Sequence, residues 1–320
     1  MAHSTRSSRS TRSTRSTRSR LRLALTALGA AAAVAAGTAA TPATAAEPRP
    51  RVPRYVALGD SFTSGPSIPR QVNLRCGRSD ANYPSIVREE LGISDRTSFT
   101  DASCGGATTD HMWNRQGATG NAPQLDAVSP DTSLVTIGIG GNDIGFGDII
   151  GRCIHPLGPV DSIPRDNPCQ RYFTQNGTDE LDKRINETAP KVAAVLKAVH
   201  ERAPHARVAV VGYPALLGDD IEGCRKSVRI ADGDIPYLRG TLRRLNAMLR
   251  RQATERGDLY VNTNTTTADH DACQPFEERY VEGLYPRASR PAAAFHPNAN
   301  GERAMAEAIV DTIIFGPGAR

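Results

Sequence analysis

The sequence predicts an α/β fold in which helices cover both faces of a five-stranded parallel sheet. Short apolar runs, largely rich in β-branched residues and bounded by turn residues, are typical of buried strands. They occupy 54–58, 98–102, 133–139, 206–212 and 258–263. Segments with helical spacing of apolar residues alternate with these runs or follow the last one, at 82–92, 179–203, 235–257 and 301–314. Strands that alternate with helices are expected to be parallel and buried on both faces.

Each element has its own signal. The strands read RYVAL, SFTDA, SLVTIGI, ARVAVVG and DLYVNT in chain order. The helix over 179–203 contains Pro190, which predicts a bend there because proline removes a hydrogen bond from a helix interior. The last helix is introduced by Pro297 and Asn298. These signals predict one domain of ordinary size after the N-terminal part.

Residues 1–46 differ from the rest of the chain. A Ser/Thr/Arg repeat over 4–22 is followed by an uncharged, Ala-rich stretch over 23–40 and then by small residues at 43–46. This order is typical of a secretory signal, so we expect a signal peptide over 1–46, cleaved near Ala45 or Ala46, and a secreted, extracellular domain over 47–320. A retained membrane anchor is the alternative.

The net charge of the whole chain is +5, but the N-terminal part supplies it. Seven of the 39 Lys and Arg residues lie within residues 1–46 and all 34 acidic residues lie after Ala46, which leaves 32 basic residues and a net charge near −2. We therefore expect no nucleic-acid partner and, after cleavage, no stable membrane anchor.

All six cysteines of the chain follow the leader: Cys76, Cys104, Cys153, Cys169, Cys224 and Cys273. An even number in an exported chain predicts three disulfides. Fifteen pairings are possible, and pairing in sequence order needs the fewest assumptions. No CxxC spacing occurs, so a zinc site is not expected.

Ligands of parallel sheets bind outside the carboxyl ends of the strands. The segments that follow the five strands are long, at about 60–80, 103–122, 140–178, 213–234 and 264–298. They contain all six cysteines, and no cysteine lies in a predicted strand or helix. The disulfides are therefore expected to cross-link the rim of the site.

Four points in these segments could carry chemistry. Gly59-Asp60-Ser61 ends the first strand, and Ser103 to Thr109 and Gly140 to Asp143 follow the second and third. Glycine amides and an asparagine amide can stabilise an oxyanion, although each stretch alone is also an ordinary turn. Pro297 fixes the backbone beside His296, a candidate general base for a serine. Other candidate bases are His270, His111 and His155.

These four blocks in this order resemble those of the SGNH (GDSL-type) hydrolases. The matching stretches are GDS, CGGATT, IGGND and HPNANGERAMAEAI, and APHARVAVVGYP, DIPYLRGTLRRLN and HDAC extend the likeness. The resemblance is to the secreted lipases and esterases of actinomycetes such as Streptomyces and covers Tyr55 to about Ile314.

The resemblance implies a flavodoxin-like three-layer α/β/α fold and a catalytic domain over 47–320. It implies the disulfides Cys76–Cys104, Cys153–Cys169 and Cys224–Cys273. It also implies ester hydrolysis through an acyl-serine intermediate without a metal or an organic cofactor. Ser61 would be the nucleophile and His296 the base. The Ser61 and Gly106 amides and the Asn142 side chain would hold the oxyanion.

One position departs from the family pattern. Many SGNH hydrolases carry an aspartate three residues before the histidine, where this chain has Ala293. The resemblance implies that the carbonyl of Ala293 or Ala294 orients His296 instead. The alternative is Asp269 or Asp271, which we expect to belong to a turn beside Cys273.

We therefore expect a secreted lipase or carboxylesterase that cleaves fatty-acyl esters such as acylglycerols. The alternatives are a phospholipase A1-like enzyme, a polysaccharide acetyl esterase and, with least support, a non-catalytic extracellular binding protein. Apolar residues of the rim could line an acyl slot or pack locally: Ile68, Phe146, Ile149, Ile150, Leu157, Leu216, Leu217 and Phe295. A monomer is the default expectation.

Overall fold

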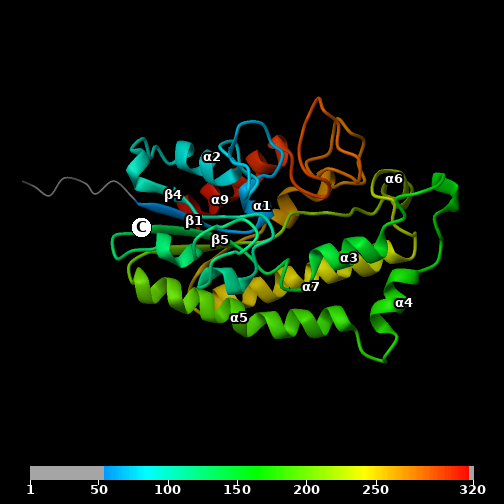
Figure 1. Cartoon of the computed structure of the whole chain (residues 1–320), viewed down its shortest axis with the longest axis horizontal. Helices are drawn as coiled ribbons and strands as arrows, with labels where there is room; N and C mark the ends of the chain where they lie inside the picture. The colour runs from blue at the N-terminus through cyan, green and yellow to red at the C-terminus, as the bar shows by residue number, and fades with distance from the viewer. Residues whose placement is uncertain (1–53, 317–320) are drawn as a thin grey trace, which may run out of the picture. The chain divides into compact units, whose positions relative to one another are not determined.

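Five parallel strands form the central sheet in the order β4-β1-β5-β6-β7 (Figure 1). The structure is a computed structural model that describes residues 54–316, so the expected leader over 1–46 lies outside the described residues. The strands are Tyr55–Gly59 (β1), Phe99–Asp101 (β4), Leu134–Gly138 (β5), Arg207–Val211 (β6) and Leu259–Val261 (β7). The second strand along the chain lies on one side of the first and the third on the other, which is the flavodoxin-like order. The prediction of a five-stranded parallel sheet is confirmed.

Helices and short turns connect the strands. The helices are Ser61–Ser64 (α1), Tyr83–Glu90 (α2), Phe146–Cys153 (α3), Pro168–Thr174 (α4), Glu180–Arg202 (α5), Ile221–Ser227 (α6), Asp234–Thr254 (α7), Thr263–Thr266 (α8) and Ala299–Phe315 (α9). The 3₁₀ turns are Arg96–Ser98, Thr109–Met112, Gln124–Ala127, Val160–Ser162 and Ala268–His270.

The sheet lies between two helical layers, with α2 and α9 on one face and α5 and α7 on the other (Figure 1). Side chains of a strand alternate between the two faces. In β1, Tyr55 and Ala57 pack with α2 and α9, whereas Val56 and Leu58 belong to the core on the α5 and α7 side. Both faces are buried, which explains why the strands read as continuous apolar runs.

The rim contains structure that the sequence pattern did not predict. A two-stranded antiparallel hairpin, Gln71–Asn73 (β2) with Arg78–Ser79 (β3), follows the first strand. Three cysteines, Cys153, Cys169 and Cys224, lie in the short helices α3, α4 and α6, so the expectation that no cysteine is helical was wrong. Each of these helices has only seven or eight residues, too few for a clear helical period.

Three disulfides hold the rim together. They join Cys76 to Cys104, Cys153 to Cys169 and Cys224 to Cys273, the pairs that the resemblance implied, and they close sequence separations of 28, 16 and 49 residues. In the chain-entropy model, loops of this size contribute about 3 to 4 kcal/mol each to the free energy of unfolding.

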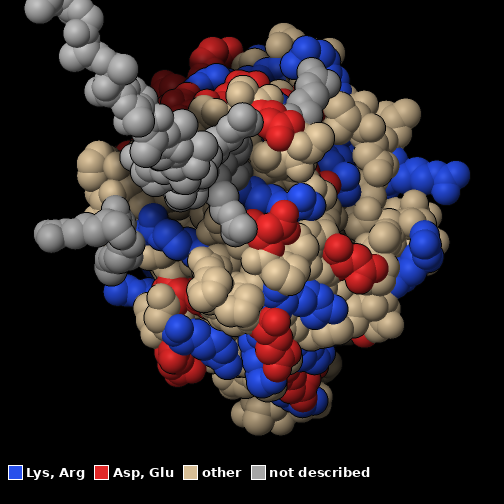
Figure 2. All heavy atoms as spheres, turned by 90° about the vertical axis from the view of Figure 1, so that its left-hand side faces the viewer, with Lys and Arg blue, Asp and Glu red and all other residues tan. Residues whose placement is uncertain are grey.

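The opposite end of the molecule, where the strands begin, shows acidic and basic side chains interspersed (Figure 2). No single sign of charge dominates the part of this face that the structure describes. Within residues 54–316, no helix combines the length and the apolar character needed to cross a membrane.

A buried carboxyl group joins the two helices of one layer. Glu302, in the first turn of α9, is fully buried, and its Oε2 accepts a hydrogen bond of 2.7 Å from the amide of Tyr83 at the start of α2. Burial raises the pKa of Glu302 well above its ordinary value. Burial therefore favours the neutral form of this side chain in the folded protein.

Replacing Glu302 by glutamine (E302Q) should leave stability nearly unchanged at pH 4 and raise it at pH 8. The carboxyl group ionises above about pH 4.5 in the unfolded chain and only at higher pH in the folded protein, so its presence lowers the free energy of unfolding as the pH rises. Glutamine does not ionise, so its contribution to stability does not change with pH. Thermal melts should show a gain of about 2 °C or more at pH 8.

Glu307→Gln is the matched control, because Glu307 lies on the same helix and is exposed. It should show no pH-dependent difference in melting temperature. An equal effect of E302Q at both pH values would contradict a neutral, buried Glu302.

Candidate active site

Ser61 is the first residue of the short helix α1, which follows a sharp turn at the end of β1. The side chain of Asp60 caps this helix by accepting from the amide of Phe62 at 2.9 Å. Gly59 leaves the strand in close contact with the sheet, since a Cβ there would lie 2.6 Å from the Gly138 carbonyl oxygen. The buried side chain of Gln124 bonds both the amide and the carbonyl of Gly59, at 2.7 and 2.9 Å. The turn that presents Ser61 is thus held on both sides.

His296 lies directly against Ser61. Its Nε2 is 2.8 Å from the Ser61 Oγ, and its Nδ1 is 2.7 Å from the carbonyl oxygen of Ala294. A carbonyl can only accept, so Nδ1 carries the proton and Nε2 is free to accept from the serine hydroxyl. The structure thus brings the two predicted catalytic side chains together and, of the two predicted carbonyls, selects that of Ala294 for Nδ1. The carbonyl of Ala293 accepts from the backbone amide of His296 instead, at 3.2 Å.

Aromatic rings enclose the imidazole. Phe62 stacks on His296 at a centroid distance of 4.7 Å, and Phe146 meets it edge-on at 5.9 Å. Burial lowers the pKa of His296, and the hydrogen bond to the Ala294 carbonyl opposes that shift. The ring is therefore neutral at neutral pH, the form that a general base requires.

The segment before α9 is fixed by backbone contacts with Glu282. The Glu282 amide donates to the carbonyl of His296 at 2.9 Å, and the Phe295 amide donates to the carbonyl of Glu282 at 3.1 Å. The buried Glu282 carboxylate binds Arg279 and the side-chain amide of Asn298. Phe295 has a φ of 61°, a left-handed conformation that costs energy for a residue other than glycine. These contacts hold that conformation in place.

The two aspartates considered as alternatives serve the neighbouring turn. Asp271 accepts from the amide of Cys273 at 2.8 Å and from the side chain of Gln274 at 3.2 Å. Within residues 54–316, neither Asp269 nor Asp271 has a hydrogen bond to His296. The expectation that they belong to a turn fits this geometry.

The predicted oxyanion donors lie on two turns that touch. The Asn142 side-chain amide donates to the carbonyl of Ala107 at 2.9 Å, next to Gly106. A Cβ on Gly105 would lie 3.9 Å from the Cβ of Ser61, so this turn also borders the serine. Among the described residues, the amide of Gly106 has no hydrogen-bond partner. The structure therefore brings Ser61, Gly106 and Asn142 to one place.

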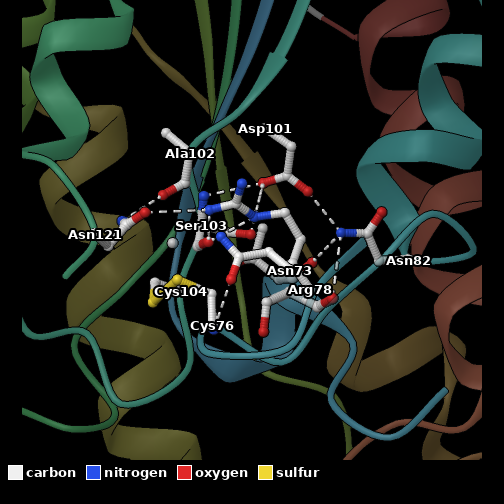
Figure 3. A network of polar contacts seen from close by, with 12 residues as sticks. Asn73, Cys76, Arg78, Asn82, Asp101, Ala102, Ser103, Cys104 and Asn121 are labelled. Atoms are coloured by element: carbon white, nitrogen blue, oxygen red, sulfur yellow. Dashed lines mark hydrogen bonds and ion pairs between the residues drawn. A yellow bond between two sulfur atoms is a disulfide. The ribbon is translucent and has the colours of Figure 1, made fainter. Parts of the chain in front are cut away.

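A partly buried polar network positions the turn that carries Gly106 (Figure 3). The Arg78 guanidinium in β3 donates to the Ser103 carbonyl at 2.8 Å and lies 3.7 Å from Asp101. Asp101 in turn accepts from the Ser103 hydroxyl at 2.6 Å and from the Asn82 side chain at 2.7 Å. Asn82 also donates to the carbonyl of Thr63 in α1, at 2.9 Å. The network thus connects the serine helix with the Gly106 turn.

These supporting residues were missed by sequence reasoning. Arg78, Asn82 and Asp101 belong to none of the recognised motifs. Their hydrogen-bond partners lie about 20 to 40 residues away along the chain and come close only when the protein folds. Two residues that hold the Asn142 turn could have been found from the sequence, because Thr109 and Asp143 belong to the motif stretches CGGATT and IGGND. The amide of Thr109 donates to Asp143 at 3.0 Å.

An apolar slot lies against Phe62, the residue that follows Ser61. Its space, counted together with the open solvent at its mouth, is about 690 Å³. Of the apolar residues predicted for such a slot, six line it: Phe146, Ile149, Ile150, Leu216, Leu217 and Phe295. Ile68 and Leu157 do not line it: Ile68 is buried elsewhere, which fits the alternative of local packing, and Leu157 is 84% exposed. Leu238, Leu242 and Leu245 of α7 complete the wall together with Tyr213.

A metal site is not supported by the donor groups of the described chain. Among residues 54–316, the cluster of Cys224, Asp271 and Cys273 has donor atoms close enough to share an ion. Its two sulfur atoms are bonded to each other in a disulfide. They are therefore not available as thiolate ligands.

Known proteins resemble this chain in sequence and fold. The profile of the GDSL-like lipase/acylhydrolase family matches residues 57–304. Lipase 2 of Streptomyces coelicolor is 38% identical, over 81% of this chain and 85% of that lipase. The crystal structure of an extracellular lipase from Streptomyces rimosus has a TM-score of 0.62 at 26% identity, over 80% of this chain and 97% of that one. Phospholipase A1 from Streptomyces albidoflavus, at 23% identity and a TM-score of 0.61, shares the fold over 80% of this chain and 97% of its own.

The family profile covers most of the chain, and the lipase from S. coelicolor matches it over a similar length. The protein is thus a carboxylic ester hydrolase and belongs to the GDSL-like lipase/acylhydrolase family.

Proposed function

We propose that the protein hydrolyses fatty-acyl esters, such as acylglycerols, through an acyl enzyme on Ser61. The single observation that carries this proposal is the contact of 2.8 Å between His296 Nε2 and Ser61 Oγ, with Nδ1 held by the Ala294 carbonyl. A serine hydroxyl becomes a nucleophile when a neutral base accepts its proton.

The reaction runs in two halves. Ser61 Oγ attacks the ester carbonyl carbon while its proton passes to His296 Nε2, and the carbonyl oxygen becomes an oxyanion bound by the amides of Ser61 and Gly106 and the Asn142 side chain. The C–O bond then breaks, and the leaving alcohol takes the proton from Nε2. In the second half, water gives a proton to Nε2 and attacks the acyl group, and Ser61 leaves with that proton.

The support of the imidazole differs from that of a Ser-His-Asp site. The Ala294 carbonyl fixes the tautomer and the orientation of His296, but it carries no full charge. It therefore stabilises the imidazolium less than a carboxylate does. For this reason, we assign to the oxyanion donors a larger share of the rate enhancement than they would have in a Ser-His-Asp site.

The slot favours an acyl chain as the group that is bound beside the serine. Its wall is almost entirely apolar, and Phe62, Phe146 and Phe295 connect it to the catalytic side chains. Exposed large apolar side chains lie in the rim segments as well: Val72, Leu74, Trp113, Leu157, Tyr172 and Tyr285. Both features support a substrate with long hydrocarbon chains over an acetylated sugar. Phospholipids, as in a phospholipase A1, remain the alternative within this class.

Export is part of the proposal. The composition of residues 1–46 supports a signal peptide, and three disulfides are typical of proteins in an oxidising compartment. We propose that residues 47–320 form a secreted, extracellular catalytic domain that acts as a monomer.

Ser61→Ala should lower kcat/KM for p-nitrophenyl octanoate by more than about 10⁴-fold, because the nucleophile is lost. It should also abolish covalent labelling by a fluorophosphonate. Ser64→Ala is the matched control, since Ser64 lies in the same short helix and its buried hydroxyl has no hydrogen-bond partner among the described residues. Unchanged turnover in Ser61→Ala would rule out the acyl-serine mechanism, and a correctly folded wild type without label would favour a non-catalytic binding protein.

The pH profile should report the state of His296. Burial lowers its pKa from the ordinary value of 6.5, and only the neutral ring can accept the Ser61 proton. We expect kcat/KM to fall about tenfold per pH unit at low pH, with a midpoint below pH 6.5. Enzyme returned from each acidic pH to pH 8 should recover full activity, which separates titration from unfolding. A reversible midpoint above pH 7 would contradict the assignment.

Filling the slot should shorten the preferred acyl chain. Ile150→Trp adds bulk to a lining residue of α3 and should lower kcat/KM for octanoate by about tenfold or more, with little effect on acetate. Leu157→Trp is the control, because Leu157 is exposed and does not line the slot. An equal loss for both esters would place the acyl chain elsewhere. The same panel, extended to phospholipids and acetylated sugars, separates the alternative substrates.

A further inference from the structure

Tyr213 places one hydroxyl group between two turns of the site. It follows β6 and is almost fully buried. Its Oη donates to Asp60 Oδ2 at 2.6 Å and accepts from the backbone amide of Gly141 at 2.6 Å. Asp60 directly precedes Ser61, and Gly141 directly precedes Asn142. A single phenol group therefore joins the turn of the nucleophile to the turn of the side-chain oxyanion donor.

The direction of each hydrogen bond is set by chemistry. The Gly141 amide can only donate, so the phenol oxygen accepts there and its one proton goes to Asp60. The other carboxylate oxygen of Asp60 accepts from the Phe62 amide at 2.9 Å. Both oxygens of Asp60 are thus acceptors, which is the arrangement of an ionised carboxylate. Burial raises the pKa of Asp60 to about 7 and neighbouring Asp143 adds to this, whereas the bonds from Tyr213 and Phe62 oppose it.

Tyr213 is itself held rigidly. The side chain of Asn246 in α7 bonds both its amide and its carbonyl, at 2.8 and 2.9 Å. The ring of Phe62 packs edge-on against the ring of Tyr213 at 5.1 Å. The phenol oxygen therefore cannot shift without disturbing α7 or the serine helix.

The position of Asn142 relative to Ser61 needs support, because Asn142 lies on the turn after β5 and Ser61 on the turn after β1. One N–H of its side-chain amide is used by the Ala107 carbonyl, so only the other is left for a substrate oxygen. The direction of that second N–H follows from the position of the Gly141–Asn142 backbone. A shift of this backbone relative to Ser61 would misplace the donor where an oxyanion forms.

We propose that Tyr213 is a positioning residue that sets the Asn142 amide at its working distance from Ser61. This inference rests on the proposed serine mechanism, to which it adds a residue outside the four motif blocks. Tyr213 also lines the apolar slot with its ring, so a variant must remove the hydroxyl and keep the ring.

The test compares Tyr213→Phe with Tyr55→Phe on p-nitrophenyl acetate and p-nitrophenyl octanoate. Tyr55 is the matched control, because its buried hydroxyl bonds Thr136 at 2.8 Å inside the sheet, away from the site. Active enzyme is counted in each variant from the end-point of fluorophosphonate labelling. Tyr213→Phe should lower kcat about 10- to 100-fold by the same factor for both esters, with KM within about twofold. Tyr55→Phe should keep kcat within about twofold of the wild type.

Three results would overturn the inference. The first is a kcat of Tyr213→Phe equal to that of Tyr55→Phe, and the second is a change in KM without a change in kcat. The third is a fall in kcat with octanoate but not with acetate, because it would give Tyr213 a role only in the apolar slot. If Tyr213→Phe does not fold, Asp60→Asn replaces it, because asparagine cannot accept at both positions. The same fall in kcat is expected, and an unchanged kcat would overturn the inference.

Different results would refute the proposed function and the positioning role of Tyr213. If Ser61→Ala retains activity, or the wild type takes no label at Ser61, the serine mechanism itself is wrong. If Ser61 is labelled to completion in Tyr213→Phe and kcat per labelled site is normal, only the positioning role is wrong.

Discussion

The five strands of the sheet run in one direction, and this constraint places the whole site at one edge. β1 lies between β4 and β5, so the turns after these three strands meet where the strand order reverses. Those turns carry Ser61, Gly106 and Asn142, and the segment before α9 brings His296 to them. The sheet supplies position, while the chemistry belongs to the turns and short segments that follow its strands.

Many polar groups of these segments lie outside the hydrogen-bond ladders of the main sheet and the long helices, and an unpaired buried amide or carbonyl is costly. Side chains from elsewhere provide the partners. Gln124 bonds both polar groups of Gly59, Asn246 does the same for Tyr213, and Arg78 bonds the Ser103 carbonyl. The three disulfides act on the same loops. The polar contacts of the rim are thus connected, and we expect a substitution of one of these side chains to shift the proposed oxyanion donors.

Much of this could be predicted from the sequence, and the limit has a physical cause. All five strands follow from local apolar runs, and Ser61 and His296 follow from motif blocks whose resemblance covers most of the chain. The β2 and β3 hairpin and the role of Arg78 could not be predicted, because they depend on contacts with distant residues that leave no periodic pattern. The choice of the Ala294 carbonyl could not be predicted either, since it goes with the left-handed backbone of Phe295, the next residue.

The carbonyl that supports His296 has one more consequence, for how such sites are recognised. A main-chain oxygen is present whatever side chain the residue carries, so the support at Ala294 is encoded in the path of the backbone and not in the identity of a residue. It has no proton to gain in acid, and alanine scanning cannot remove it. A search for a triad by residue type would find an incomplete set here, although the base has both of its hydrogen-bond partners.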